Sequence, residues 1–272
     1  KLYCSENKLS TIDISEAYNL VLIDCADNNI RDLNIESCKK LKILRCNGNQ
    51  IKSLKINSLD SLEELNISDN KNLSDIDFVR RPNIKHLSCA NLDIEHLDLS
   101  GMSNLNYLDC SLNKLKDLNL LKTPSLVWLD CKENKISKIS LNHVPNLTGL
   151  DCKHNQISEL DFSSSPGITW IDCSENLLQQ LDVSQLKDLT WIQCKSNEIY
   201  DINLPKNSKL RELLCSNNNL LTLLLNDCQN LNELIWNDNA LTILDLSRNN
   251  NLIHVDCHNN KRYKTWKDTL IF

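Results

Sequence analysis

The stretch Leu126-Val127-Trp128-Leu129-Asp130-Cys131-Lys132-Glu133-Asn134-Lys135-Ile136 decides the fold, because close variants of it recur along the whole chain. Aligned on its asparagine, the pattern occurs at Asn7, Asn28, Asn49, Asn70, Leu92, Asn113, Asn134, Asn155, Asn176, Asn197, Asn218, Asn239 and Asn260. Every interval is 21 residues except the one from Asn70 to Leu92, which is 22. A fixed period of this length indicates a repeat protein whose units pack on their neighbours.

Each repeat has its own pattern of apolar residues, counted here from the asparagine as position 0. Positions −8, −5, +2, +5 and +7 are aliphatic, as in Leu126, Leu129, Ile136, Ile139 and Leu141. Around positions −5 and −3, apolar residues alternate with more variable ones, which is the period of a strand with one buried face. Each repeat therefore predicts one short strand that pairs in parallel with its neighbours.

The asparagine lies between apolar positions, so its amide is predicted to be buried and to bond backbone groups of adjacent coils. Leu92 cannot make these bonds and follows the 22-residue repeat, which predicts a local irregularity at about residues 70 to 94. After the Leu-Asp-Leu-Ser segment that begins at position +5, only about six residues remain before the next repeat, too few for a multi-turn helix. The return side is predicted to be extended or to form a tight turn.

Eleven of the thirteen cysteines share position −3, which Ile67 and Trp236 fill in two other repeats. A position that accepts Cys, Ile or Trp is a core position, where free cysteine behaves as a small hydrophobe. Parallel strands also stand too far apart for an undistorted disulfide, so we predict a column of buried, mostly reduced thiols. Cys38 and Cys228 lie outside this column and are the better candidates for exposed or reactive thiols.

The pattern L-x-x-L-x-C-x-x-N-x-L-x-x-L-D-L-S resembles the leucine-rich repeat, and its 21-residue period with Cys in the strand resembles the cysteine-ladder subclass of internalins and related bacterial surface proteins. The resemblance covers residues 1–260 and implies an α/β-class solenoid of about 13 coils, with a parallel concave sheet and a short convex side. Residues 261–272 depart from the pattern and are predicted to cap the array. The resemblance also implies an extracellular or cell-surface location and a role in adhesion to host cells.

In such solenoids the residues at −6, −4 and −2 face a partner. Aromatic residues gather at −6, at Tyr107, Trp128, Trp170 and Trp191, and beside them stand Asp109, Asp130, Asp151 and Asp172 at −4 with Lys132 and Lys153 at −2. Clustered aromatics favour a binding surface, since binding hot spots use such residues. The aspartates have two open interpretations: part of a recognition strip, or residues that simply recur with the repeat.

A second polar group, His254, Asp256 and His258, alternates along the last predicted strand and could ligate zinc. Three ordinary polar residues on an end strand are the favoured interpretation, because so short a pattern recurs by chance. No cofactor is predicted. The sequence contains no phosphate-binding loop and no recognisable hydrolase or metalloprotease motif, so we predict that the chain is not an enzyme.

The net charge of −6, with both signs interspersed, argues against a nucleic-acid partner, and no apolar run is long enough to cross a membrane. The chain opens within a repeat, which suggests a fragment of a longer protein. Our first hypothesis is a non-enzymatic recognition domain that binds a host protein or glycoprotein through its concave face. The alternatives are a glycan-binding module, with tryptophans stacked on sugar rings, and the substrate-targeting array of an intracellular effector.

Overall fold

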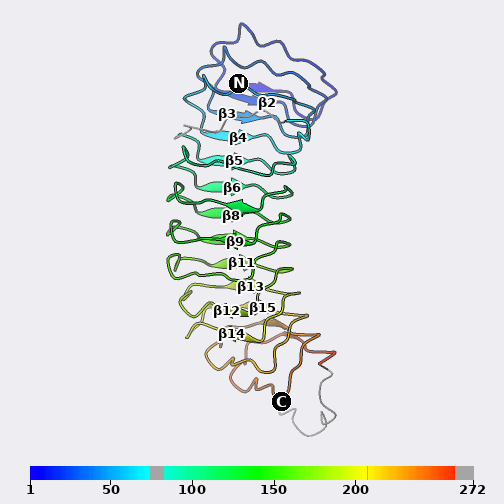
Figure 1. Ribbon diagram of the computed structural model, residues 1–272, viewed down its shortest axis with the longest axis vertical. Coiled ribbons are helices and arrows are strands. Elements are labelled where there is room, and N and C mark those ends of the chain that lie inside the picture. The colour runs from blue at the N-terminus through cyan, green and yellow to red at the C-terminus, as the bar shows by residue number, and fades with distance from the viewer. Residues whose placement is uncertain (74–82, 207, 261–272) are drawn as a thin grey trace. The chain divides into compact units, whose positions relative to one another are not determined.

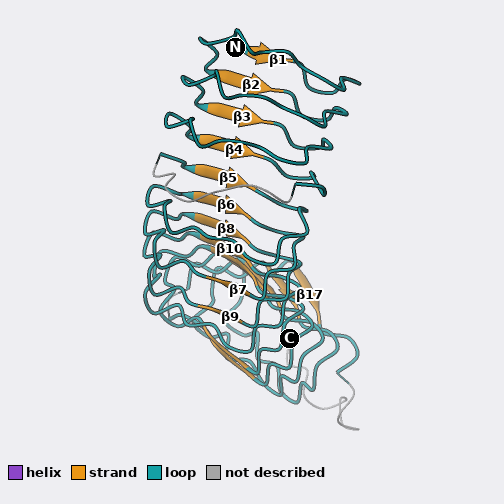
Figure 2. Ribbon diagram, turned by 45° about the horizontal axis from the view of Figure 1, so that its top comes forward, coloured by secondary structure: helices purple, strands orange, loops and turns teal. Residues whose placement is uncertain are grey.

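The structure, a computed structural model, describes residues 1–73, 83–206 and 208–260. It divides into two compact units, Lys1–Lys135 and Ile136–Phe272. Strands and loops make up both units, and no helix occurs in the described ranges (Figure 2). The predicted parallel repeat architecture is confirmed, and the α/β label matters little, because the return segments are too short for helical turns. Within the same ranges there is no helix long and apolar enough to span a membrane.

In the first unit, successive repeats each add one strand of two or three residues to a parallel sheet (Figure 1). Equivalent positions pair directly, as Leu44 does with Leu65 and Leu108 with Leu129. Side chains of one phase therefore form a column across the strands. In spatial order the strands are β1 (Leu2–Tyr3), β2 (Leu22–Asp24), β3 (Ile43–Arg45), β4 (Glu64–Asn66), β5 (His86–Ser88), β6 (Tyr107–Asp109) and β8 (Trp128–Asp130).

The second unit repeats this arrangement, and Ile171 pairs with Ile192 in the same register. Its parallel strands are β10 (Gly149–Asp151), β11 (Trp170–Asp172), β13 (Trp191–Gln193), β15 (Glu212–Leu214), β16 (Glu233–Ile235) and β17 (His254–Asp256). On its return side, β12 (Gln180–Asp182) pairs in parallel with β14 (Asp201–Asn203). Two further short return-side strands are β7 (Asp117–Leu118) in the first unit and β9 (Lys138–Ile139) in the second. The predicted extended return side is thus confirmed for these coils.

A left-handed residue ends the strand side of every coil. Position −1 has φ between 52° and 63° in all thirteen repeats, yet Gly48 is the only glycine among them. Most of the others are Asp, Asn or Glu, and Asp and Asn enter this region more readily than other side chains. This turn places the next residue, the asparagine, in the core.

The buried asparagines bond the backbone of adjacent coils, as predicted. Asn113 shows the donor pattern: its Nδ2 donates to the carbonyl oxygens of Cys89 (2.9 Å), Cys110 (3.0 Å) and Ser111 (3.0 Å). Its Oδ1 accepts from the backbone N–H groups of Leu92 (3.0 Å) and Ile94 (3.2 Å). One amide therefore closes its own turn and ties it to the preceding coil.

The 22-residue repeat alters the register and the turn. Glu64 of β4 pairs with His86 of β5, an offset of 22 residues. Leu92 is buried in place of the asparagine, and Asp93 adopts a second left-handed conformation (φ 63°) that has no counterpart at the described equivalent positions of the other repeats. Residues 74–82 of the predicted irregularity and the predicted cap at 261–272 lie outside the described residues. The array boundaries stay predictions.

The cysteine column lies in the core, as predicted, and all thirteen cysteines are free. Ile67 and Trp236, which replace cysteine in this column, are fully buried. The prediction for Cys38 and Cys228 is wrong, because both side chains are 0% exposed. They occupy position +10, which is a further core column on the return side; its other fully buried members include Leu59, Met102, Val144 and Leu186.

Thiol labelling of the folded protein tests this burial. We expect a disulfide-exchange reagent to modify the partly exposed Cys4 and Cys257 first, and Cys38 and Cys228 only after unfolding. Burial raises the pKa of the Cys228 thiol to about 11, which leaves little reactive thiolate at neutral pH. Mass spectrometry of the modified peptides, with and without denaturant, gives the rates. Equal rates for Cys228 and Cys4 in native buffer would show that the return-side core is open.

Candidate functional site

The outer face of the first unit's sheet carries the first half of the predicted binding residues. Tyr107 opens β6, Trp128 opens β8, and the two are direct partners in the strand register. Both side chains are half-buried, so the aromatic stripe is partly covered rather than fully exposed. His86 of β5 extends the row, with its ring centroid 6.2 Å from that of Tyr107 and the planes tilted by 32°.

Two carboxylates stand beside these rings. Asp109 pairs with Asp130 in the register, and Lys132 forms an ion pair with Asp130. Burial raises the pKa of Asp130, the neighbouring Asp109 charge adds to this rise, and the hydrogen bond from Lys132 opposes it. Lys132 therefore offsets the repulsion between the Asp109 and Asp130 carboxylates on adjacent strands.

The second unit's sheet carries the other half. Trp170 and Trp191 pair in the register and stack face to face, with ring centroids 4.7 Å apart and planes within 3° of parallel. Asp151 and Asp172 stand beside them at position −4. Gln193 Nε2 donates to Asp172 Oδ2 (3.4 Å). The stacked pair is half-buried on the side of the sheet opposite the aliphatic core.

Lys153, the remaining predicted residue, lies at position −2 in the same unit. Its Nζ is 3.4 Å from Glu175 Oε1, and His154 Nδ1 is 3.0 Å from the other oxygen of that carboxylate. The hydrogen bond with His154 and the charge of Lys153 lower the pKa of Glu175. Lys153 thus shares its carboxylate partner with a histidine.

The aspartates at −4 also have a structural task. One oxygen of each accepts the backbone N–H two residues later, in Asp109 (3.1 Å), Asp130 (3.2 Å), Asp151 (3.1 Å) and Asp172 (3.0 Å). This local hydrogen bond shapes the chain as it leaves the strand. It supports the interpretation that the aspartates recur with the repeat, while the second oxygens of Asp130 and Asp172 make the ion pair and the amide contact described above.

Sequence reasoning missed a hollow on the outer face of the first unit. Its lining residues come from three neighbouring strands and are Glu64, Leu65, Asn66, His86, Ser88 and Tyr107. Ser88 is the shortest side chain of the −4 column between Asn66 and Asp109, which leaves space above β5. The sign of this hollow in the sequence was Ser88, a small residue at a position where the other repeats have longer side chains.

The candidate metal ligands do not converge. Among the described residues, no group of three or more His, Cys, Asp or Glu side chains is arranged to hold a metal ion. His258 Nδ1 bonds Asp256, whereas His254 Nδ1 lies 3.1 Å from Glu233 on the neighbouring strand. Each imidazole thus has its own carboxylate partner, and the hydrogen bond from His258 lowers the pKa of Asp256.

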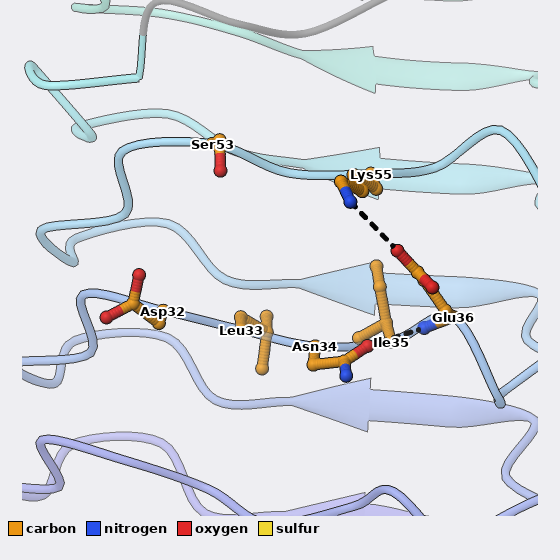
Figure 3. Close-up of a pocket in the computed structure, with 7 residues that line it drawn as sticks. All are labelled: Asp32, Leu33, Asn34, Ile35, Glu36, Ser53 and Lys55. Atoms are coloured by element: carbon orange, nitrogen blue, oxygen red, sulfur yellow. Dashed lines mark hydrogen bonds and ion pairs between the residues drawn. The ribbon is translucent and has the colours of Figure 1, made fainter.

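A second hollow lies on the return side of the first unit (Figure 3). It is lined by Asp32, Leu33, Asn34, Ile35, Glu36, Ser53 and Lys55. Lys55 reaches across it to Glu36, with 3.3 Å between Nζ and Oε1. Both partners of this ion pair are well exposed, so it adds little stability.

A solenoid of mostly 21-residue coils, with a buried asparagine after most strands and a column of cysteines in the core, is a leucine-rich-repeat structure of the cysteine-ladder type. The chain is similar to the functional domain of InlJ from Listeria monocytogenes, which includes a cysteine ladder. The identity is 31%, the match covers 92% of this chain and 61% of that one, and the TM-score is 0.80. No protein-family model and no curated protein matches the sequence.

Two more distant similarities show the fold alone. A leucine-rich-repeat protein of Leptospira interrogans is 23% identical over 87% of this chain and 66% of its own, with a TM-score of 0.78. An internalin of Listeria monocytogenes, InlF, is 21% identical over 90% of this chain and 89% of its own, with a TM-score of 0.58. The chain therefore spans 61% and 66% of the two relatives with the higher TM-scores.

Proposed function

We propose that this chain is a non-enzymatic recognition domain of a bacterial surface or secreted protein, which binds a host protein or glycoprotein through the outer faces of its parallel sheets. The stacked pair of Trp170 and Trp191 carries the proposal. Its rings stand on the face opposite a core that Ile171 and Ile192 already fill, so they are not needed for packing there. Tryptophan is among the residues that dominate binding energy at protein interfaces.

The polar residues supply orientation. Asp130 with Lys132 in the first unit and Asp172 in the second place charge directly beside the rings. Charged groups at such a rim favour complementary partners and set the direction of approach more than they add affinity. The internalin resemblance implies a surface or secreted location and a role in adhesion, and the similarity to the functional domain of InlJ supports that resemblance.

The stacking geometry favours a protein contact at this pair. Because the parallel arrangement covers one face of each indole, a sugar ring could stack on at most one face of Trp170 and one of Trp191. The edges of the two rings suit an apolar side chain of a partner. Such a contact gains free energy by burying apolar surface and needs no flat ring-to-ring stacking.

Replacing both tryptophans tests the proposal. We expect the double variant Trp170→Ala, Trp191→Ala to bind cultured epithelial cells at least about tenfold more weakly in flow cytometry, since one such hot spot contributes about 2 kcal/mol or more. Tyr200→Ala is the matched control, because Tyr200 is an aromatic residue 51% exposed outside the −6 column. Unchanged binding by the tryptophan variant, with its fold intact by circular dichroism, would refute the proposed face.

Pretreating the cells identifies the kind of receptor. The proposal expects protease treatment to remove binding, whereas removal of glycans alone should leave binding that still depends on Trp170 and Trp191. A separate double variant, Tyr107→Ala with Trp128→Ala, measures the contribution of the first unit.

A further inference from the structure

We propose that the hollow over β4, β5 and β6 is a binding subsite for a single neutral sugar ring of the pyranose type. It shares only Tyr107 with the residues of the proposed protein-binding face, so this proposal goes beyond that function. The hollow lies over Ser88, whose side chain is shorter than those of Asn66 and Asp109, its neighbours in the −4 column.

The walls of the hollow combine two flat rings with short polar groups. His86 and Tyr107 stand side by side along one flank, and Asn66 and Ser88 form the other. A pyranose has an apolar ring face, which packs on aromatic rings, and adjacent hydroxyl groups, which both donate and accept hydrogen bonds. An amide and a hydroxyl side chain offer both kinds of partner to such a ligand.

Local hydrogen bonds order the Asn66 side of the hollow. Asn66 Oδ1 accepts the backbone N–H of Ser68 (3.1 Å), which fixes the amide plane. Ser68 Oγ in turn accepts the backbone N–H of Ala90 (3.1 Å), which ties the chain leaving β4 to the chain leaving β5. A site held in shape before the ligand arrives loses less entropy on binding.

Charge selects a neutral occupant. Glu64 Oε1 lies 2.6 Å from Arg45 Nε, and Arg45 is also 3.7 Å from Asp24. The Glu64 carboxylate is therefore already paired, so a cationic side chain would have to compete with Arg45. An anionic ligand would meet the Glu64 and Asp109 carboxylates on either side of the hollow. A ligand without charge avoids both costs.

The test uses the complete chain and a panel of methyl glycosides of glucose, galactose, mannose, fucose, N-acetylglucosamine and N-acetylgalactosamine. Saturation-transfer NMR detects binding, and titration gives the dissociation constant. We expect at least one glycoside to bind with a dissociation constant of about 1 mM, a typical affinity for so small a contact. Filling the hollow with Ser88→Leu should weaken that binding at least about tenfold.

We expect this variant to fold, since Leu214 and Ile235 occupy the same position on β15 and β16, and circular dichroism checks it. Gln193→Leu, which adds a leucine at −4 outside the hollow, is the matched control and should bind as the parent does. His86→Ala, which removes a wall at an exposed position, is a second variant and should also bind more weakly. The proposal is overturned if no glycoside binds, if both hollow variants keep the parent affinity, or if Nα-acetyl-arginine amide binds while the glycosides do not.

Discussion

Raising the pH from about 8 to about 10.5 is expected to unfold this protein steeply, because its core holds protonated thiols that the unfolded chain would ionise. Burial raises the pKa of the Cys25 thiol to about 12 and that of Cys228 to about 11. The same cause raises the thiol pKa in further fully buried cysteines, namely Cys46, Cys89, Cys110, Cys173, Cys194 and Cys215.

The direction of this pH effect follows from comparing the thiol pKa in the folded and unfolded states. An unfolded thiol has a pKa of about 8.5, so above that pH the unfolded chain loses protons that the folded chain keeps. The stability is fully present below the unfolded pKa and falls as the pH rises toward the folded pKa. Each such thiol contributes about 1.4 kcal/mol per pH unit, and eight of them set an upper bound of about 11 kcal/mol per unit. That exceeds the stability of many domains, which is roughly 5–15 kcal/mol.

Urea titrations at several pH values under reducing conditions measure the effect, and ultraviolet absorbance of the thiolate follows ionisation directly. Lysines and tyrosines also titrate in this range, so the control is a variant with Cys110→Val and Cys173→Val. Ile67 shows that an aliphatic side chain fits the same column. The free energy of unfolding of the variant should fall less steeply with pH than that of the parent, because unfolding of the variant releases two fewer thiol protons. A urea midpoint that stays constant up to about pH 10.5 would contradict the ladder as a buried thiol column.

The repeat made the main elements of the fold predictable from one stretch. The period places equivalent residues of different repeats in the same surroundings. Ile67 and Trp236 hold the position that Cys131 holds in its own repeat, and this variation is enough to identify a core position. The asparagine was predictable for the same reason, since a polar residue repeated between core positions has to find backbone partners. The paired register of Leu129 with Leu108 follows directly.

Exposure was harder to predict than the face on which a side chain lies. Cys38 was misassigned because position +10 varies between apolar and small polar residues, so its column does not stand out as the strand columns do. The left-handed turn at −1 carries only one glycine, Gly48, and so lacks the usual signal. The hollow beside Ser88 depends on how the side-chain sizes of adjacent coils compare. The apolar pattern within one coil carries no such information.

The second large effect is expected from Asn113→Ala, which should lower the free energy of unfolding by about 3–5 kcal/mol. The Asn113 amide is only 7% exposed and makes five hydrogen bonds to the backbone of two coils. Each buried group left without a partner costs about 1–3 kcal/mol, and relaxation around the alanine keeps the total below the sum. Urea denaturation measures the change. Asn7→Ala is the control and should cost under about 1 kcal/mol, because Asn7 is exposed and its amide bonds only the carbonyls of Cys4 and Ser5.

Asn113→Asp separates hydrogen bonding from packing. Aspartate has nearly the shape of asparagine, so a role limited to filling space predicts almost no loss of stability. Its second oxygen would face the carbonyls of Cys89, Cys110 and Ser111, which accept hydrogen bonds from Nδ2 in the native protein. An ionised carboxylate donates nothing, so we expect Asn113→Asp at neutral pH to be at least as unstable as Asn113→Ala, and to recover partly at acidic pH as the carboxyl gains a proton to donate. An aspartate variant as stable as the parent would mean that packing, rather than the amide, joins successive coils.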